Sequence, residues 1–539
     1  MVAVILALLF APLAAGLASL AVPARAGAAI TMTSGIASFG LVLALVPAAA
    51  HRTLGYGSYF RVDAVSVIFM LATAFLYAAV AVYSAGYLRT ETEGEDPAAA
   101  RRYVRRFYAL FNVFGWSMLL APMVNSLALL WIAVEVTTVV SALLVALESS
   151  DAAVEAAWKY VLIASAGLGL GLLATIFAYF AGAQVLGQHY DLALNTILHV
   201  GSRLPHTPVR FAFMLAVLGY GTKMGLFPVH TWLPDAHSEA PTPVSALLSG
   251  SLLAVSFYAI LRYYQIATAT LGSAFPRAVL LAFGVASLLL AALYLLDQRD
   301  LKRLLAYSSV EHMGILAIGV SFGAPVALAG VMLHVLAHAA AKGNAFMSAG
   351  VFTIKFGSKQ ISAHRGAMDL LPWSGPLFLL AVLALSAMPP FGIFRSEFQI
   401  VAGGFDSHGY AAAAALIVLV TVAFFGLTAS ATRMLFRSRR PAGGRAAPAA
   451  GSAAPAVHPS PGNNGRPGGH GSPEPAGTAG VAMLERTAAS RVPARGEPSA
   501  WMVVPAVAGI AVLLILGLHP PGELTQLISR AVAQIGGAA

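Results

Sequence analysis

The sequence contains no cysteine, and only 10% of its 539 residues are charged, whereas 58% are hydrophobic. Without cysteine, the chain cannot form a disulfide, hold an iron–sulfur cluster through thiolates or build a thiolate zinc site. Any electron transfer must therefore take place in a partner protein, and we expect no cofactor on the chain itself. So few charges among so many apolar residues lie outside the usual composition of soluble domains and predict a polytopic membrane protein.

The net charge of +10 reflects membrane topology and does not indicate nucleic-acid binding. Lys and Arg gather in alternate segments between apolar stretches, as the positive-inside rule requires of cytoplasmic loops. We therefore expect a multi-pass protein of the inner (plasma) membrane, with cytoplasmic loops at residues 89–106, 299–303, 355–365 and 437–495. An even number of crossings then places both termini outside.

Apolar stretches of roughly 20 residues predict an all-α fold with about fourteen transmembrane helices. The first 22 residues resemble a signal peptide, but they lack its positively charged start, so we expect a retained first helix. Residues 441–480 are rich in Pro, Gly, Ala and Ser and predict a disordered cytoplasmic loop. The predicted spans begin near Met1, Ala28, Val62, Phe107, Ser126, Ala157, Val209, Thr242, Ala278, Leu301, Val326, Leu370, Ala411 and Trp501.

Prolines interrupt two of these spans at corresponding positions. Pro228 lies in GLFPVHTW of the seventh span, and Pro389 and Pro390 lie in LSAMPPFGIF of the twelfth, about 160 residues and five helices later. Because five is odd, the second copy is inserted upside down, and paired broken helices of this kind indicate an inverted-repeat transporter. Freed backbone groups also predict a hydrated interior at the breaks. For either break alone, an ordinary proline kink is the alternative.

Two charges lie inside the first of these repeats. Glu135 is the only charge between Arg106 and Glu148, and Lys223 lies a few residues before the Pro228 break. A charge in mid-span costs about 2.5–3.5 kcal/mol on insertion scales, so such a residue generally has a partner and a function. A Glu135–Lys223 pair would be a proton device whose two charges depend on each other. The alternative is a static ion pair that fixes helix register.

The eleventh span carries a polar stripe. His334, His338 and Lys342 occur at i, i+4 and i+8 in HVLAHAAAKG, close to one face of a helix. Two histidines and a lysine on one stripe favour a hydrated proton relay over isolated hydrogen-bonding side chains. We expect no metal here, because the Glu of the HExxH zinc motif is absent and no third ligand is evident.

Further charges are candidates for the relay or for its entrance. Glu397 follows the second break, beside Arg395, and we place it in the relay. Lys302 begins the tenth span, where snorkelling to the interface is an equal alternative, and Lys159 is either a relay member or a topology anchor. The remaining candidates lie deeper in the tenth span (Glu311 and His312) or follow the first break toward a proton entrance (His230, Asp235, His237 and Glu239).

These segments resemble the antiporter-like family shared by respiratory complex I, Mrp cation/proton antiporters and membrane-bound [NiFe] hydrogenases. KMGLFPVHTWLPDAHSEAPTPVSALL resembles its broken seventh helix, with Lys223 as the central lysine; WIAVE places Glu135 at its fifth-helix glutamate. HVLAHAAAKGNAFMSAG, LKRLLAYSS and FGIFRSEF are similar to its eleventh, tenth and twelfth helices. The similarity covers residues 103–436 and is strongest to the hydrogenase-4 (formate hydrogenlyase) F/B type.

The resemblance implies fourteen helices with two inverted five-helix repeats and discontinuous helices 7 and 12. The chain departs from the family in its eighth span, which lacks the mid-helix lysine or histidine of many members and carries only Arg262, near its outer end. The tail after the last helix is at most a short amphipathic segment. The implied divisions are an N-terminal three-helix segment (1–106), two repeats (107–262 and 263–436), the disordered loop (437–499) and a last helix with its tail (500–539).

The implied function is that of a non-redox, proton-translocating subunit of a hydrogenase-4-like or complex I-like (NADH dehydrogenase-related) oxidoreductase. Other membrane subunits, the lipid bilayer and a peripheral arm with [NiFe] and/or iron–sulfur centres would be its partners. The alternatives are an Mrp-type sodium/proton antiporter subunit, a membrane subunit of an inorganic-carbon uptake complex, and a structural subunit whose charges only hold helices together.

Overall fold

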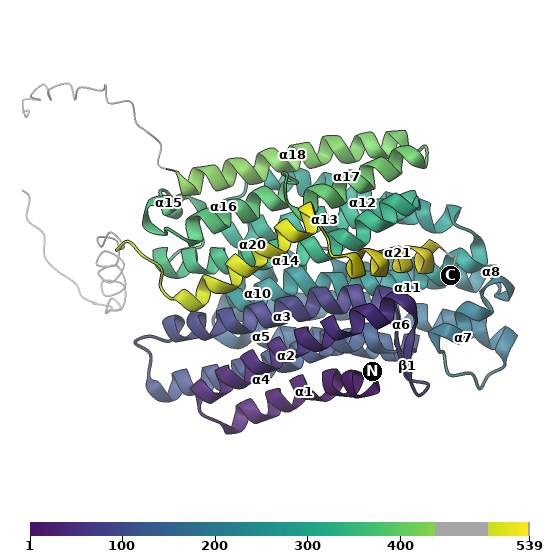
Figure 1. Cartoon of the computed structure of the whole chain (residues 1–539), viewed down its shortest axis with the longest axis horizontal. Coiled ribbons are helices and arrows are strands. Elements are labelled where there is room, and N and C mark those ends of the chain that lie inside the picture. The colour runs from purple at the N-terminus through teal and green to yellow at the C-terminus, as the bar shows by residue number, and fades with distance from the viewer. Residues whose placement is uncertain (437–493, 537–539) are drawn as a thin grey trace, which may run out of the picture. The chain divides into compact units, whose positions relative to one another are not determined.

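The computed structural model describes residues 1–436 and 494–536, which pack into one helical unit apart from a short hairpin (Figure 1). Most of the predicted 437–499 loop lies outside the described residues. The first part of the unit contains α1 (Val2–Ala21), α2 (Ala24–His51), β1 (Leu54–Tyr56), β2 (Phe60–Val62), α3 (Ala64–Glu91), α4 (Pro97–Leu120), η1 (Ala121–Met123), α5 (Leu127–Val145), η2 (Ala146–Glu148) and α6 (Asp151–Leu186).

The chain continues through the segment that carries the first predicted break and into the long central helices. These elements are α7 (Leu194–His199), η3 (Gly201–Arg203), α8 (His206–Met224), α9 (Trp232–Glu239), α10 (Thr242–Leu247), the π-helix η4 (Leu248–Leu252), α11 (Leu253–Leu271), α12 (Ala274–Leu295), α13 (Leu301–Phe322) and α14 (Pro325–Phe356).

The last part contains the second predicted break and the C-terminal helices. Its elements are η5 (Ile361–His364), α15 (Ala367–Leu370), α16 (Ser374–Leu385), α17 (Gly392–Asp406), α18 (Tyr410–Leu435), η6 (Ala500–Met502), α20 (Val504–Leu518) and α21 (Gly522–Gly536). The start of α1 and the end of α21 lie toward the same end of the unit, together with α7 and the antiparallel β1–β2 hairpin (Figure 1). An all-α prediction misses this hairpin, which is only three residues long in each strand.

Short polar side chains start several of these helices. The Asp63 carboxylate caps α3 by accepting a hydrogen bond from the Ser66 amide at 2.9 Å, and Asp300 caps α13 in the same way through the Arg303 amide. Asp96 caps α4, whose first residue is Pro97. Each cap satisfies one of the amides that the first turn of a helix leaves free. The α4 helix begins at Pro97, ten residues before the predicted start at Phe107. The prediction missed its first turns because they carry arginines, which lower the hydropathy.

Among the described residues, eleven helices are long and apolar enough to cross a membrane. The predicted number was about fourteen. The three predicted spans outside this set are α4, which carries four arginines, and the two interrupted spans, each of which divides into pieces of fewer than 20 residues. The protein is therefore a mostly helical, polytopic membrane protein, while the count of fourteen and the inverted repeat stay predictions.

The chain leaves helical conformation at both predicted interruptions. Between α8 and α9, Gly225 adopts φ +85°, a conformation that glycine accepts without steric cost, and the Phe227 amide donates to Ser287 Oγ at 2.9 Å. Between α16 and α17, the Met388 amide donates to the Leu383 carbonyl at 3.0 Å. The prolines of both interruptions are exposed on the surface of the chain. The exposure of these prolines differs from the expected hydrated interior. Local turns and one hydroxyl satisfy the amides that the breaks free.

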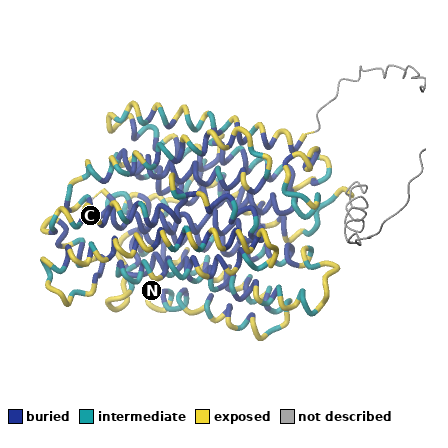
Figure 2. Tube along the Cα trace, turned by 180° about the vertical axis from the view of Figure 1, so that it is seen from behind, coloured by how far each residue is buried: buried dark blue, intermediate teal, exposed yellow. Residues whose placement is uncertain are grey.

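The most deeply buried helices are α10–α11, α13 and α14. All of the hydrophobic window of Thr242–Leu271 is buried, as are 94% of that of α13 and 89% of that of α14. The α14 helix packs against α3, α13, α16, α17 and α20. Figure 2 shows the buried residues in the middle of the unit and the exposed ones on the outer helices and connections. Polar side chains on these central helices are thus held away from lipid.

Candidate functional site

Lys223 lies in the last turn of α8 and its side chain is fully buried. Its ammonium nitrogen donates hydrogen bonds to the Val134 carbonyl at 3.0 Å and to the Thr138 hydroxyl, both on α5. The nitrogen also lies 6.0 Å from the centre of the Tyr160 ring, which is within the range of a cation–π contact. Neutral oxygens and an aromatic ring therefore surround this amine.

Glu135 lies on α5 between the two residues that bind Lys223, and it is only half-buried. Its Oε1 accepts a hydrogen bond from the Ser165 hydroxyl of α6 at 3.1 Å, and Oε2 has no partner in the described part of the chain. No ion pair joins Glu135 to Lys223 among the described residues, although the two groups interact electrostatically. The reason is helical geometry: Val134 and Thr138 are one turn apart and face Lys223, whereas Glu135 is rotated by about 100° from Val134 toward α6.

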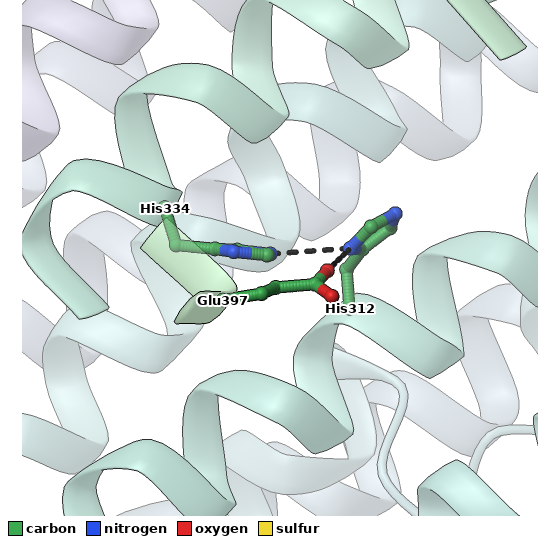
Figure 3. Close-up of side chains that lie close together, drawn as sticks. All are labelled: His312, His334 and Glu397. Carbon is green, nitrogen blue, oxygen red and sulfur yellow. Dashed lines mark hydrogen bonds and ion pairs between the residues drawn. The ribbon is translucent and has the colours of Figure 1, made fainter. Parts of the chain in front are cut away.

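A second group of polar side chains converges from α13, α14 and α17 (Figure 3). His312 Nδ1 lies 3.1 Å from His334 Nε2 and 3.8 Å from Glu397 Oε1. His334 Nδ1 lies 2.9 Å from the hydroxyl of Ser396. The ligand atoms of His312, His334 and Glu397 all lie within 4.8 Å of one another, and all three side chains are buried. The sequence pattern offered no third ligand beside His334 and His338; in the structure, His312 and Glu397 form a three-ligand group with His334 and not with His338.

The polar stripe of α14 extends from this cluster toward Lys342. The His338 ring centre lies 5.1 Å from that of His312, and both ring nitrogens of His338 lack hydrogen-bond partners among the described residues. Lys342 Nζ donates to the Leu305 carbonyl and to the Ser308 hydroxyl, each at 2.8 Å. Glu311, one helical turn beyond Ser308 on α13, is buried and interacts electrostatically with Lys342. The tenth and eleventh predicted spans therefore share one polar seam.

Lys302 and His237 lie between this seam and the basic loops. Lys302 is only 3% exposed and donates to the Ala240 carbonyl at 2.8 Å, so it does not snorkel to the surface. His237 is fully buried beside Phe346, has two unpartnered ring nitrogens among the described residues, and lies within electrostatic reach of both Lys302 and Lys342. Both residues are placed where a proton could pass between the loops and α14.

The other predicted entrance residues lie nearer the surface. Lys159 is 49% exposed and forms ion pairs with Glu155 at 2.7 Å and with Asp235 at 3.4 Å, and Arg303 binds Asp235 at 2.8 Å. Glu239 binds Lys359 at 2.9 Å, and His230 is buried close to Phe227 without contact to the α14 stripe that the structure records. This placement favours the topology-anchor alternative for Lys159.

Hydroxyl groups occupy the region where the eighth span lacks a charge. The π-helix η4 contains Ser249, whose hydroxyl lies 2.7 Å from that of Ser309 on α13. Ser309 is adjacent in the chain to Ser308, which binds Lys342. Short π-helical segments occur frequently at functional sites. No sequence pattern predicted this pair, although Ser249 directly follows the quoted segment KMGLFPVHTWLPDAHSEAPTPVSALL and Ser309 ends the quoted segment LKRLLAYSS.

The one charge of the eighth span, Arg262, belongs to a separate cluster. Its guanidinium binds Asp63 at 2.6 Å, Gln265 at 2.9 Å and Tyr258 at 2.9 Å, and it is 1% exposed. Asp63 also pairs with Arg61 at 3.3 Å. Burial opposes ionisation of Asp63, but the two guanidinium groups outweigh it and lower the pKa of Asp63 to about 2. This ion pair joins the start of α3 to α11 and does not replace a mid-helix relay residue.

These contacts define two groups of protonatable side chains, one around Lys223 and one along the seam of α13 and α14, each beside hydroxyls and carbonyls, which is a suitable arrangement for moving protons or small cations. The serine–histidine contact of this site does not activate a nucleophile, because the Ser396 hydroxyl donates to the Ile393 carbonyl and so accepts from His334. Chain comparison agrees with this class. Residues 124–424 match the family described as "NADH:quinone oxidoreductase/Mrp antiporter, TM", and the chain belongs to this family.

Two curated relatives and one solved structure are among the most similar proteins. The chain is 35% identical over 368 residues to a hydrogenase-4 component F homolog of Methylacidiphilum infernorum, covering 68% of this chain and 76% of the relative. It is 31% identical to the NADH-quinone oxidoreductase subunit N of Desulforudis audaxviator, covering 69% and 72%. A chain of the Mrp complex from Dietzia sp. superposes with a TM-score of 0.77 at 20% identity, covering 99% and 98%, which shows a shared fold.

Proposed function

We propose that this protein is the non-redox, proton-translocating membrane subunit of a hydrogenase-4-like or complex I-like oxidoreductase. The observation that carries the proposal is the set of buried amines, imidazoles and carboxylates on α8, α13, α14 and α17, together with the half-buried Glu135 of α5. A membrane protein retains such groups at a cost in stability, and they generally mark ion pathways. The similarity to a hydrogenase-4 component F homolog over three quarters of that protein favours the hydrogenase-4-like assignment.

In the proposed mechanism, Lys223 is the central proton carrier and Glu135 modulates it from the α6 side. A lysine bound by one carbonyl and one hydroxyl can keep hydrogen bonds in both its charged and its neutral form, because a neutral amine still has two N–H donors. Loss of a proton therefore does not leave the site without partners. Glu135 influences the amine through space, without the strong direct bond that would hold the proton in place.

The second half of the proposed path runs from Lys342 along His338 and His334 to Glu397. Glu311 and His312 belong to it because they share the seam between α13 and α14. We infer that the Ser249–Ser309 hydroxyl pair, at 2.7 Å, takes over part of the link that a lysine or histidine of the eighth helix provides in many relatives. A hydroxyl both donates and accepts a hydrogen bond, so the pair can pass a proton along and is neutral before and after the transfer.

The finer architecture belongs to the same proposal. Fourteen crossings would include α4 and the two interrupted spans, α8–α9 and α16–α17, and spans four to eight and nine to thirteen would form two inverted repeats. Both termini would then lie outside the inner membrane. The partners would be other membrane subunits and a peripheral arm with [NiFe] and/or iron–sulfur centres, since a chain without cysteine cannot hold such clusters through thiolates.

Replacement of Lys223 by alanine tests the central step. The Lys223→Ala complex should assemble with its normal set of subunits, as judged by mass spectrometry after purification in mild detergent, but it should lose coupled proton movement in proteoliposomes. Arg433→Ala is a control, because this basic residue is exposed on α18 and lies outside the proposed path. Normal proton movement by a well-assembled Lys223→Ala complex would refute the proposed carrier.

An Mrp-type sodium/proton antiporter subunit is the second candidate. Its support is the family itself, whose description covers both quinone oxidoreductases and Mrp antiporters, together with the absence of a charged residue in the middle of the eighth span. Vesicles containing the complex distinguish the two. An antiporter would produce pH gradients that depend on sodium and persist when hydrogenase and quinone chemistry are blocked. A redox-coupled subunit would produce gradients that need electron donor and acceptor.

A further inference from the structure

The cluster of His312, His334 and Glu397 has the geometry of a metal site. Zinc–nitrogen bonds of about 2.0–2.1 Å place two donors of a tetrahedral ion about 3.4 Å apart. The two measured separations, 3.1 Å between His312 Nδ1 and His334 Nε2 and 3.8 Å between His312 Nδ1 and Glu397 Oε1, lie on either side of this value. Both separations from His312 Nδ1 differ from this value by only a few tenths of an ångström, and all three ligand atoms lie within 4.8 Å of one another.

We propose that His312, His334 and Glu397 bind one divalent transition-metal ion, such as Zn²⁺ or Co²⁺, and that the bound ion blocks transport through the second half of the path. The binding part of this proposal stands on the geometry alone. The blocking part rests on the proposed function. The ion would be an inhibitor and not a resident cofactor, because it would occupy the groups that must exchange protons.

The hydrogen bonds around His334 prepare it to act as a ligand. The Ser396 hydroxyl donates its only proton to the Ile393 carbonyl at 2.8 Å, so it must accept from His334 Nδ1 at 2.9 Å. His334 Nε2 is then the nitrogen with the lone pair; it accepts from His312 Nδ1 at 3.1 Å and points toward His312 and Glu397 (Figure 3). Metal-binding histidines generally have their second nitrogen fixed in this way by a neighbouring acceptor.

The other two ligands, His312 and Glu397, each have an atom that makes no hydrogen bond within the described residues. Glu397 Oε1 and His312 Nε2 lack hydrogen-bond partners among the residues that the structure describes. When His312 Nδ1 bonds to a metal, the ring can carry its proton on Nε2, so binding does not require an anionic imidazole. Two imidazole nitrogens and one carboxylate oxygen select zinc, cobalt, nickel or copper over magnesium and calcium, which prefer oxygen ligands only.

The ligands belong to three helices: α13 and α14, which follow each other in the chain, and α17, which comes after the second interruption. An ion bound to all three would tie these helices together and would use the His334 lone pair that faces His312. Proton exchange between His312, His334 and Glu397 would stop. We therefore expect Zn²⁺ to inhibit transport and a chelator to restore it.

Titration of the purified full-length complex with Co²⁺ tests binding through the visible difference spectrum against the complex that lacks all three ligands, in which absorption by partner metal centres cancels. The chain contains no cysteine, so no cobalt–thiolate band from this subunit can interfere. Wild-type protein should show one site per chain with nitrogen and oxygen ligands. His312→Gln, His334→Gln and Glu397→Gln should each weaken binding by at least 10–100-fold, and Ser396→Ala by about tenfold, as expected for loss of a partner that orients a ligand.

His338→Gln is the matched control for binding. His338 lies one turn from His334 on the same helix and is equally buried, but it is not one of the three ligands, so its replacement should leave the cobalt spectrum and affinity unchanged. Size-exclusion profiles and thermal unfolding would show that each variant is folded. Equal cobalt affinity in the wild type and in a folded variant that lacks all three ligands would overturn the proposal.

Inhibition is measured separately on the wild-type complex and on a His364→Gln control. His364 is a buried histidine outside the path. The concentration of Zn²⁺ that halves proton movement should match the Zn²⁺ affinity obtained by competition with Co²⁺. Cobalt binding without inhibition would overturn the blocking part. Binding in a complex that moves no protons under any condition would leave the metal site intact and refute the proposed function.

Discussion

At the scale of single residues, neutral oxygens provide the recorded hydrogen bonds of the deeply buried amines. Lys223 binds a carbonyl and a threonine hydroxyl, Lys342 binds a carbonyl and a serine hydroxyl, and Lys302 binds a carbonyl. A direct carboxylate partner would favour the charged amine strongly, whereas neutral partners favour neither form as strongly. Such sites suit residues that must gain and lose protons in turn.

The hydrogen-bonded pair of Ser249 and Ser309 gives a prediction at this scale. Ser249→Ala removes the hydroxyl that lies 2.7 Å from Ser309 and should reduce proton movement several-fold without changing assembly, whereas Ser249→Thr keeps a hydroxyl and should retain most of the activity. Proton flux in proteoliposomes is the measurement. Ser251→Ala is the control, because Ser251 belongs to the same π-helix but bonds to Thr73 of α3. Equal losses in both alanine variants would contradict the link.

At the scale of elements, the sequence predicted the helix that carries each polar residue better than it predicted which residues meet. The stripe of His334, His338 and Lys342 follows from helical periodicity, and the structure places all three on the buried α14. The meeting of His312, His334 and Glu397 depends on the packing of three helices, which no local pattern encodes. The sequence also could not predict the direction of the Glu135 side chain. A shift of one residue along α5 turns a side chain by about 100° and decides whether it faces α8 or α6.

The contact between α3 and α11 gives a prediction for two elements. Asp63→Asn should lower the thermal unfolding temperature of the purified complex, because it leaves Arg262 buried without its charge partner; breaking a buried pair of this kind costs about 3–5 kcal/mol. The lowered pKa of Asp63, about 2, sets the sign of the pH effect. Its contribution to stability is present above the usual aspartate pKa of about 4 and is lost as the pH falls through 2.

A double replacement separates charge from packing in this experiment. Asp63→Leu combined with Arg262→Met removes the fully buried pair and should be more stable than Asp63→Leu alone, because Arg262 no longer remains as an unpaired buried ion; both variants lose the α3 cap and the Arg61 contact equally. Thermal unfolding in the same detergent is the measurement. If the double variant is as unstable as the sum of the single changes, the Asp63–Arg262 pair does not act as a unit.

At the scale of the whole molecule, hydropathy located all eleven membrane-length apolar helices of the described residues. It failed where a helix is amphipathic, as in the arginine-rich start of α4, and where strands are too short to show a pattern, as in the β1–β2 hairpin. The tail after the last predicted span forms α21, whose Leu527, Ile528, Ala531 and Ile535 are buried. Its amphipathic character was predicted, but its packing against α2, α3 and α14 was not.

The orientation of the molecule in the membrane gives the last prediction, and the absence of native cysteine makes the test direct. Ser529 of α21 and Ser149 after η2 are both exposed, and the basic loops place them on opposite sides, with Ser149 in the cytoplasm. A membrane-impermeant thiol reagent should label Ser529→Cys in intact cells and Ser149→Cys only in inside-out vesicles. Labelling of both variants from one side would contradict the charge argument, and the reverse pattern would mean that the basic loops face outward.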